Sequence, residues 1–295
     1  MRRLATFACI GLSLCALAQG AFAAQSPRES AAQPSDKALL AAVGKGDATA
    51  AGALLDTQFE WTNAAGLTRN SSETLQNISA LAAGLQGETG VQSYSYDQLE
   101  VFTGTRPNAR FMRIWARRPQ GWRLFAMIET ASTPGAAAPF PATLGGPALD
   151  CDNPCRTIPF NPETPAQREM LAIFKQLKVD EWRPNPDGWG RYVLEDVYYV
   201  TSAAVMSKQD RVARLAQQRQ SGAVALPGDP VVSMRIAEFG GQSAVMLARH
   251  APYRGGKPYY SLRVWAHRDG RWQLANTQQT TIEAAAPVAP FTPRP

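Results

Sequence analysis

The residues of this sequence that could do acid–base, nucleophilic or metal chemistry are few and widely spaced. Its 295 residues include two histidines, His250 and His267, both in strand-like segments. The sequence has no Gly-x-Ser-x-Gly turn for a nucleophilic serine, no phosphate-binding glycine loop and no cluster of metal ligands. We therefore expect no metal site and no cofactor, and we expect both histidines to be ordinary structural residues.

Of the four cysteines, two lie in the expected signal peptide and two in the rest of the chain. Cys9 and Cys15 lie in residues 1–23, where two arginines, an apolar run and the small residues Ala-Phe-Ala are typical of a secretory signal peptide. The remaining pair, Cys151 and Cys155, then reaches an oxidising compartment, which favours a disulfide between them. Free thiols and a metal site, which would need two further ligands, are the alternatives. We expect a periplasmic or secreted protein.

The overall charge does not indicate a nucleic-acid partner. The net charge of +6 and the sequence pI near 9.3 come mainly from arginines that are spread along both halves of the chain. Binding to nucleic acid normally concentrates such residues in a patch. Beyond the signal peptide no stretch is apolar enough to span a bilayer, so we expect no stable membrane span.

A long internal repeat sets the expected domain plan. The stretches RIWARRPQGWRLFAMIET, from Arg113, and RVWAHRDGRWQLANTQQT, from Arg263, are identical at seven of eighteen positions. Each predicts a pair of antiparallel strands, and the elements around them recur in the same order. We expect a signal peptide over 1–23, a flexible leader over 24–35, a first domain over 36–130, a Pro/Gly-rich linker with the cysteine pair over 131–162, a second domain over 163–283 and a disordered Pro-rich tail over 284–295.

The order of helices and strands, with the stretches KGDATAAGALLDTQFEWTNAAG and QGWRLFAM, resembles the nuclear transport factor 2-like superfamily. That superfamily includes ketosteroid isomerase and the SnoaL-like proteins. The resemblance implies an α+β protein of two tandem cone-shaped domains, each a curved antiparallel sheet wrapped around N-terminal helices. It also implies a pocket between sheet and helices. Because this fold serves many functions, the resemblance does not fix one.

The first strand of each domain supplies the expected ligand-binding residues. Trp61 and Asn63 share one side of the first strand, and Tyr198 and Ser202 share the matching side in the second domain. These side chains line the pocket if that side faces inward; the alternative is that Trp61 and Tyr198 are simply core. The resemblance places the isomerase's aspartate base at Asn63 and Ser202. A neutral amide or an unactivated hydroxyl cannot act as that base.

We therefore expect a non-catalytic module that binds a small apolar ligand or a cell-envelope protein. An isomerase, dehydratase or cyclase acting on a small hydrophobic substrate is one alternative, and a purely structural scaffold is another. The repeated strand, which begins each of the two similar stretches, suggests how the halves meet. Its polar face combines arginine with tryptophan, a mixture enriched at interfaces. We expect an intrachain pseudo-dimer with Arg113, Trp115, Arg263 and Trp265 near the contact; the alternatives are a homodimer or two domains without a fixed contact.

Overall fold

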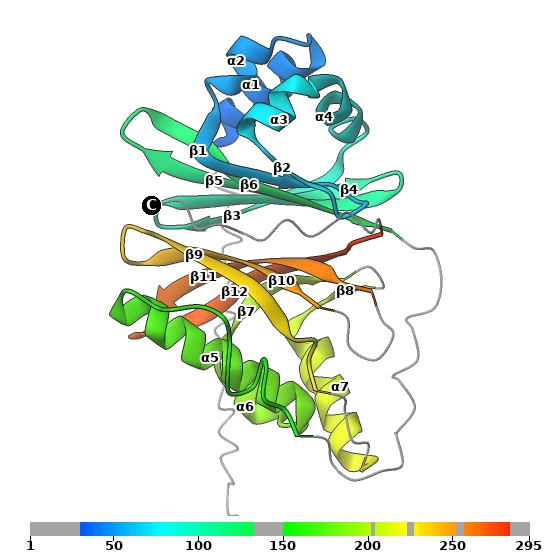
Figure 1. The fold of residues 1–295 in the computed structure, drawn as a ribbon, viewed down its shortest axis with the longest axis vertical. Helices are drawn as coiled ribbons and strands as arrows, with labels where there is room; N and C mark the ends of the chain where they lie inside the picture. Colours follow the sequence, from blue (N-terminus) through cyan, green and yellow to red (C-terminus); the bar gives the residue numbers. More distant parts are fainter. Residues whose placement is uncertain (1–29, 133–149, 202–203, 223–226, 252–256, 284–295) are drawn as a thin grey trace, which may run out of the picture.

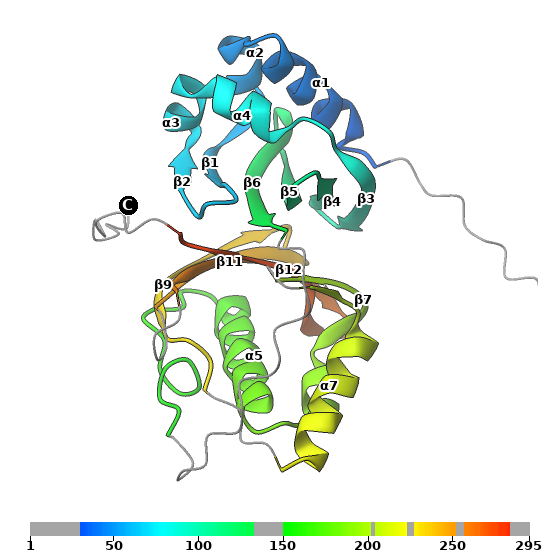
Figure 2. The ribbon, with the colours of Figure 1, turned by 90° about the vertical axis from the view of Figure 1, so that its right-hand side faces the viewer.

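The protein consists of four stacked layers, helices, sheet, sheet and helices, as Figures 1 and 2 show. The computed structural model describes residues 30–132, 150–201, 204–222, 227–251 and 257–283. The expected signal peptide and tail, half of the leader, much of the linker, and Ser202 lie outside these ranges. Each sheet has six strands, and the helices of each half cover the outer face of its own sheet.

The two halves have the same strand order, β2-β1-β6-β5-β4-β3 and β8-β7-β12-β11-β10-β9. The elements of the first half are α1 (Gln33–Gly44), α2 (Ala48–Gly52), β1 (Leu55–Thr62), β2 (Thr68–Asn70), α3 (Ser71–Gln76), α4 (Ile78–Gly84), β3 (Thr89–Tyr96), β4 (Leu99–Arg106), β5 (Ala109–Arg118) and β6 (Gly121–Ala131). Those of the second half are α5 (Pro165–Trp182), α6 (Pro186–Arg191), β7 (Val193–Val200), β8 (Val205–Met206), α7 (Lys208–Gln220), β9 (Val231–Phe239), β10 (Ser243–His250), β11 (Tyr259–Arg268) and β12 (Arg271–Thr281). The α+β class with two tandem domains is confirmed.

The sheets are mixed, which corrects the expectation of purely antiparallel sheets. β1 runs parallel to β6, and β7 runs parallel to β12. The reason lies in the connection: after β1 and β2 the chain passes through α3 and α4 and enters the sheet again at its far edge, as β3. A four-stranded meander then brings β6 back beside β1, pointing the same way.

Local sequence signals explain where the helices begin. The side chain of Asn70 accepts from the Glu73 amide and the side chain of Glu73 accepts in return, a capping box that starts α3. Ser207 and Asp210 form the same box at the start of α7. The stretch WRPNPDGWG, from Trp182, contains α6, whose first turn is capped by Asn185. This short helix precedes β7 as α2 precedes β1.

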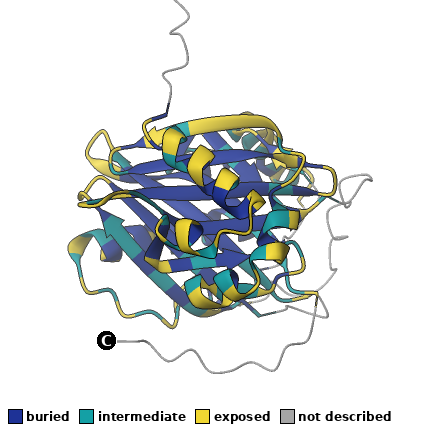
Figure 3. Cartoon of the chain, turned by 90° about the horizontal axis from the view of Figure 1, so that it is seen from above, coloured by how far each residue is buried: buried dark blue, intermediate teal, exposed yellow. Residues whose placement is uncertain are grey.

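The two sheets pack face to face through apolar side chains. The contact surface comprises Met112, Ile114 and Ala116 of β5 and Leu262, Val264 and Ala266 of β11, with further residues from neighbouring strands. Figure 3 shows the buried sheets beneath exposed helix surfaces. Phe125 and Phe239 meet edge to face across the contact, with ring centroids 5.1 Å apart. The contact is a continuous core between the domains.

The centre of this contact has approximate two-fold symmetry. The Thr130 hydroxyl donates to the Gln279 carbonyl at 2.7 Å, and the Thr280 hydroxyl donates to the Glu129 carbonyl in return. The two hydroxyl oxygens lie 3.2 Å apart. Because these threonines are equivalent positions of the repeat, the contact is isologous, like that of a symmetric dimer. At the rim, Arg235 of the second half forms a 3.1 Å ion pair with Glu60 of the first.

The residues expected at this contact lie on the opposite face of each sheet, so that prediction is wrong. Successive side chains of a strand point to opposite faces. Arg113 and Trp115 of β5, and Arg263 and Trp265 of β11, therefore point toward the helices of their own half, where the two tryptophans are fully buried in the domain cores. Both faces of each sheet are buried. The more apolar face joins the two sheets, and the face with polar groups lines the domain interior.

Candidate functional site

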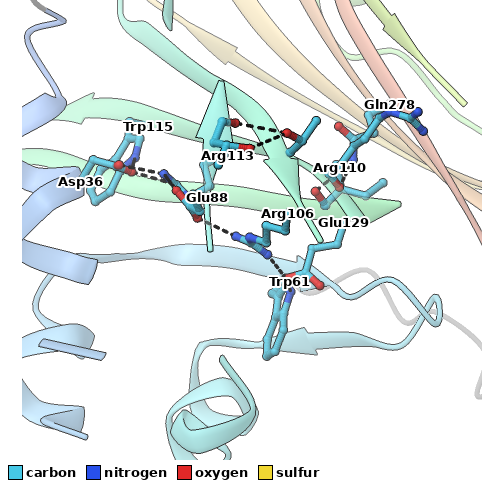
Figure 4. Close-up of polar contacts among 12 residues, drawn as sticks. Asp36, Trp61, Glu88, Arg106, Arg110, Arg113, Trp115, Glu129 and Gln278 are labelled. Carbon is cyan, nitrogen blue, oxygen red and sulfur yellow. Dashed lines mark hydrogen bonds and ion pairs between the residues drawn. The ribbon is translucent and has the colours of Figure 1, made fainter. Parts of the chain in front are cut away.

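The interior of the first domain holds a buried carboxylate between an arginine and a tryptophan (Figure 4). Asp36, on α1, accepts two bonds from the Arg113 guanidinium, Nε to Oδ1 and Nη2 to Oδ2, both at 2.8 Å. The Trp115 indole donates to the same Oδ1 at 2.9 Å. A bidentate arginine–carboxylate pair is the strongest arrangement available to these groups. Asp36 thus satisfies two neighbouring donors of β5 at once.

Further ion pairs extend this contact across the first domain. Glu88 pairs with Arg113 and also accepts from Arg106 at 2.8 Å. Arg106 in turn bonds Glu129 at 2.9 Å, and Glu129 accepts from the Trp61 indole at 3.1 Å. Burial disfavours the charge on Arg113, but the Asp36 and Glu88 carboxylates outweigh burial and raise its pKa. Both buried arginines are therefore neutralised by carboxylates of the chain itself.

The equivalent arginine of the second domain has no such partner. Arg263 is 3% exposed, and one of its nitrogens, Nη1, donates to the Ser261 hydroxyl. No Asp or Glu of the described residues forms an ion pair with it. The helix residue that faces its guanidinium is Phe174 of α5, whose ring centroid lies 4.8 Å from Cζ. Burial lowers the pKa of Arg263, the reverse of the direction at Arg113.

The tryptophan equivalent to Trp115 also lacks the carboxylate partner found in the first domain, among the described residues. Trp265 is fully buried, and its indole Nε1 has no hydrogen-bond partner within the described part of the chain. It follows Arg263 by two residues on the same face of β11, as Trp115 follows Arg113 on β5. An unsatisfied buried donor costs free energy that a hydrogen bond would recover. Among its described residues, the second domain therefore keeps both donors of the first domain's carboxylate site without the carboxylate.

A small cavity lies beside Arg263. Its volume is about 10 Å³, measured as the space open to the centre of a water molecule, which is room for about one water. Its walls combine Phe174, Leu177, Trp189 and Leu274 with the polar side chains of Lys178, Glu181, Tyr199, Arg263 and Thr277. The cavity is thus enclosed between α5, α6 and the sheet, with apolar walls and charged groups at one side.

The cations around this cavity outnumber the carboxylates. Glu181 accepts from Lys178 at 2.7 Å and from Arg211 of α7 at 3.3 Å. Burial favours the neutral acid, but these cations outweigh burial and lower the pKa of Glu181 to about 2. Burial also lowers the pKa of Lys178. Among the described residues that line the cavity, Glu181 is the one carboxylate beside the cations Lys178 and Arg263, so the lining carries a net positive charge.

His250 supports Arg263 through a serine. Its Nε2 lies 3.1 Å from the Ser261 hydroxyl that accepts from Arg263, and its Nδ1 lies 3.1 Å from the Asp229 carbonyl. The ring stacks on Tyr259 at a centroid distance of 4.3 Å. Burial, followed by the nearby charge of Arg263, lowers the pKa of His250 well below its usual value. The imidazole is therefore neutral at pH 7 and fixes the position of Ser261.

The residues expected to bind ligand are not brought together. Trp61 is inside the first domain, bonded to Glu129. Asn63 lies in the turn after β1, where its side chain accepts from the Ala65 and Leu67 amides. Tyr198 lies on the face that meets the other sheet, and the centroid of its ring is 6.3 Å from that of Tyr94. A binding role for these residues is left as a prediction, and Tyr198 lies on the opposite face of β7 from the cavity.

A one-residue slip in the repeat explains the position of Tyr198. Trp61 pairs with Met127, and Tyr199 pairs with Thr277, so Tyr199 is the equivalent of Trp61. A slip by one residue moves every side chain of a strand to the other face. The inward residue of β7 is therefore Tyr199, which lines the cavity.

The disulfide between Cys151 and Cys155 is confirmed. Both half-cystines pack on Trp182, near the end of α5. Asn153, between them, binds the backbone of Val231 on both sides, as donor to its carbonyl at 2.9 Å and acceptor from its amide at 2.8 Å. The cysteine loop thus fastens the chain before α5 to the edge strand β9.

No group of three or more His, Cys, Asp and Glu side chains in the described ranges is arranged to hold a metal ion. No helix there is both long and apolar enough to cross a membrane.

Comparison with known proteins finds similarity to solved structures at low sequence identity. No family model and no curated protein matches the chain. Among solved structures, an NTF2-like protein from Cytophaga hutchinsonii is similar at 17% identity, over 40% of this chain and 100% of that one, with a TM-score of 0.34. An NTF2-like protein of unknown function in nutrient uptake from Rhodospirillum rubrum is similar at 16% identity, over 37% and 95%, with a TM-score of 0.31. An NTF2-like protein with a cystatin-like fold from Novosphingobium aromaticivorans is similar at 10% identity, over 41% and 84%, with a TM-score of 0.34.

Each of these similarities spans about the length of one domain and bears on the fold alone. The two halves share one strand order and the same placement of helices against the sheet. The similar solved structures are themselves described as NTF2-like. The chain is therefore similar to NTF2-like structures over about the length of one domain at a time.

Proposed function

We propose that the protein is a non-catalytic module that binds a small anionic molecule in the interior of its second domain. The observation that carries this proposal is the buried guanidinium of Arg263, which borders a cavity and has no ion pair among the described residues. A buried charge without a partner is costly, so a ligand of opposite charge gains the interaction that the folded chain lacks. The first domain, whose buried arginines are already paired, serves as its structural partner.

The carboxylates of the interior favour binding over catalysis. A general base works best when its pKa lies near the operating pH. Glu181, the carboxylate of the cavity wall, has a pKa lowered to about 2 by Lys178 and Arg211 and is a weak base. In the first domain, Asp36, Glu88 and Glu129 each bind an arginine. These paired carboxylates are poor general bases, which supports binding rather than isomerase, dehydratase or cyclase chemistry.

The character of the cavity also changes the expected ligand. A small apolar molecule gains little from a wall that carries Lys178, Glu181 and Arg263. A pure scaffold gains nothing from a buried arginine without an ion pair, because apolar residues of similar size would be at least as stable there. We therefore favour an anion over both alternatives.

Export belongs to the same proposal. Residues 1–23 have the composition of a signal peptide, and the Cys151–Cys155 disulfide fits an oxidising compartment. We expect cleavage after Ala23 in a bacterial host that exports the protein. Sequencing the N-terminus of protein recovered from the periplasm checks this; a mature chain that still begins at Met1 would contradict export.

Native mass spectrometry of gently purified protein tests the binding proposal, followed by denaturing extraction of any retained molecule. We expect the wild-type protein to retain a small anion and Arg263→Met to lose it. Thermal unfolding against a panel of small anions and neutral molecules provides a second readout. If the measured mass is that of the protein alone and no small molecule raises its unfolding temperature, the scaffold alternative is favoured.

A further inference from the structure

We propose that the ligand of the second domain is a small monocarboxylate, whose carboxylate binds between Arg263 and Trp265 as the Asp36 carboxylate binds between Arg113 and Trp115. This inference rests on the proposed function and names the class of its ligand. The acidic group of Asp36 is a carboxylate on a single methylene carbon, so acetate is its nearest free equivalent. The first domain thus shows, within the same chain, what the second domain can hold.

The correspondence between the two sites is based on strand register. Arg113 pairs with Met127 and Trp115 with Leu124 in the first sheet; the pairs Arg263–Thr277 and Trp265–Leu274 repeat this register 150 positions later. Both sheets have their irregularity at the same place, directly before the tryptophan. The guanidinium and indole donors therefore leave equivalent backbone positions of equivalent strands.

The donors also match the chemistry of a carboxylate. In the first domain, Asp36 Oδ1 accepts from both Arg113 Nε and Trp115 Nε1, while Oδ2 accepts from Arg113 Nη2. In the second domain, Arg263 Nη1 is held by Ser261, and Trp265 Nε1 has no partner among the described residues. A planar carboxylate can accept from a guanidinium edge and an indole N–H together, as the Asp36 carboxylate does in the first domain. A monatomic anion has one centre and cannot reproduce this arrangement.

The size of the cavity restricts the ligand to a small molecule. A space for about one water beside Arg263 can admit a carboxylate oxygen. Trp265 is not part of the cavity wall, so the ligand must widen the cavity toward the sheet to reach the indole. Phe174 and Leu177 of α5 are the apolar side chains that a short tail would contact. Because the space beside Arg263 holds about one water, it favours a small free molecule over a larger group.

The test is titration of the purified protein with acetate and with acetamide, its neutral isostere, at constant ionic strength with chloride as the balancing anion. Binding is measured by calorimetry and by the shift in unfolding temperature. We expect acetate to bind and to stabilise, and acetamide to do neither. Trp265→Phe keeps an aromatic ring and removes the N–H, so it should weaken acetate binding by about tenfold or more. Trp115→Phe is the matched control in the first domain and should leave acetate binding unchanged.

Each other result has a defined meaning. If acetamide binds as well as acetate and both are lost in Arg263→Met, the second domain binds small molecules but the carboxylate inference is wrong. If chloride competes with acetate at equal concentration, the site takes any small anion and the inference is also wrong. If Trp265→Phe binds acetate as tightly as the wild type, the two-donor geometry is refuted. If none of these probes binds and no anion copurifies, the proposed function itself fails.

Discussion

The contrast between Trp115 and Trp265 predicts that one conservative substitution has opposite effects at equivalent positions. Trp115→Phe removes an indole N–H that donates to the buried Asp36 carboxylate at 2.9 Å. Trp265→Phe removes an indole N–H that has no partner among the described residues. Both tryptophans are fully buried, so the smaller ring leaves a comparable space in both variants. The difference between the two free energies of unfolding therefore isolates the N–H group.

The magnitude follows from the acceptor and from burial. Loss of a hydrogen bond to a charged group costs about 1.5 to 3 kcal/mol, so Trp115→Phe should lose that amount beyond the shared cost of the smaller ring. Removal of an unsatisfied buried donor recovers about 1 to 3 kcal/mol, which offsets the shared cost in Trp265→Phe. The two variants should differ by about 2.5 to 6 kcal/mol. In a protein of this size that corresponds to a difference in unfolding temperature of at least about 5 °C.

The assay is urea unfolding followed by tryptophan fluorescence and circular dichroism. The proteins are first refolded from denaturant into chloride buffer without carboxylates, because a ligand retained at Trp265 would make Trp265→Phe destabilising. Acetate added afterwards should stabilise the wild type and Trp115→Phe, and stabilise Trp265→Phe much less. Equal losses of stability in the two variants, in ligand-free buffer, would refute the reasoning, because they would mean that both indoles have a hydrogen-bond partner.

Three further predictions concern other parts of the molecule. The pKa of His250 is lower in the folded state than in the unfolded chain, so below pH 6.5 the unfolded state binds a proton that the folded state does not. The free energy of unfolding should therefore fall by up to about 1.4 kcal/mol for each pH unit below pH 6.5. The variant His250→Gln should remove this contribution to the pH dependence of urea unfolding. Cys155→Ser should cost about 2 kcal/mol in the same assay, because the disulfide closes a very short loop. Thr280→Val should cost about 1 to 3 kcal/mol, because it leaves a buried carbonyl of Glu129 without that donor.

Each of these predictions has a control and a contradicting result. His267, partly exposed beside Trp272, is the chain's second histidine, and His267→Gln should keep this pH dependence; an unchanged pH dependence in His250→Gln contradicts the first prediction. For the disulfide, wild-type protein under strong reductant should match Cys155→Ser. Thr281→Val, next along β12, is the control for Thr280, and equal effects of the two would contradict a special role for the reciprocal threonine contact.

The sequence predicts the repeat and the strand pair well, because many positions agree at one offset. It does not show which face of β5 or β11 meets the other sheet, because both faces are buried and alternation alone cannot tell one buried face from the other. Arg113 and Trp115 look like interface residues for the same reason that they suit an interior: they combine apolar surface with hydrogen-bond donors. The partner that distinguishes these roles, Asp36, lies 77 residues away from Arg113 in the sequence.

Other errors have similarly local causes. Matching Asn63 with Ser202 shifts β7 by one residue against β1, because the structure makes Trp61 and Tyr199 equivalent, and this shift assigns the inward face of β7 to Tyr198 instead of Tyr199. The six residues of α6 are too few to show helical periodicity, and Asn-Pro-Asp-Gly is typical of a turn. Lys178 and Glu181 occupy positions on α5 that a sequence alone assigns to solvent. A charged residue four positions after Phe174 in an apolar stripe is the one signal that could have drawn attention to them.

The reciprocal contact of Thr130 and Thr280 has a consequence for how this protein can change over evolutionary time. In a symmetric homodimer every substitution occurs in both subunits, so an aspartate that pairs with the buried arginine of one subunit does so in the other as well. Here the two halves of the symmetric contact belong to one gene product, and each position can be substituted alone. The chain can therefore keep a first domain whose buried arginines are paired with its own carboxylates, while the second domain acquires a different interior. A homodimer of identical subunits cannot do this.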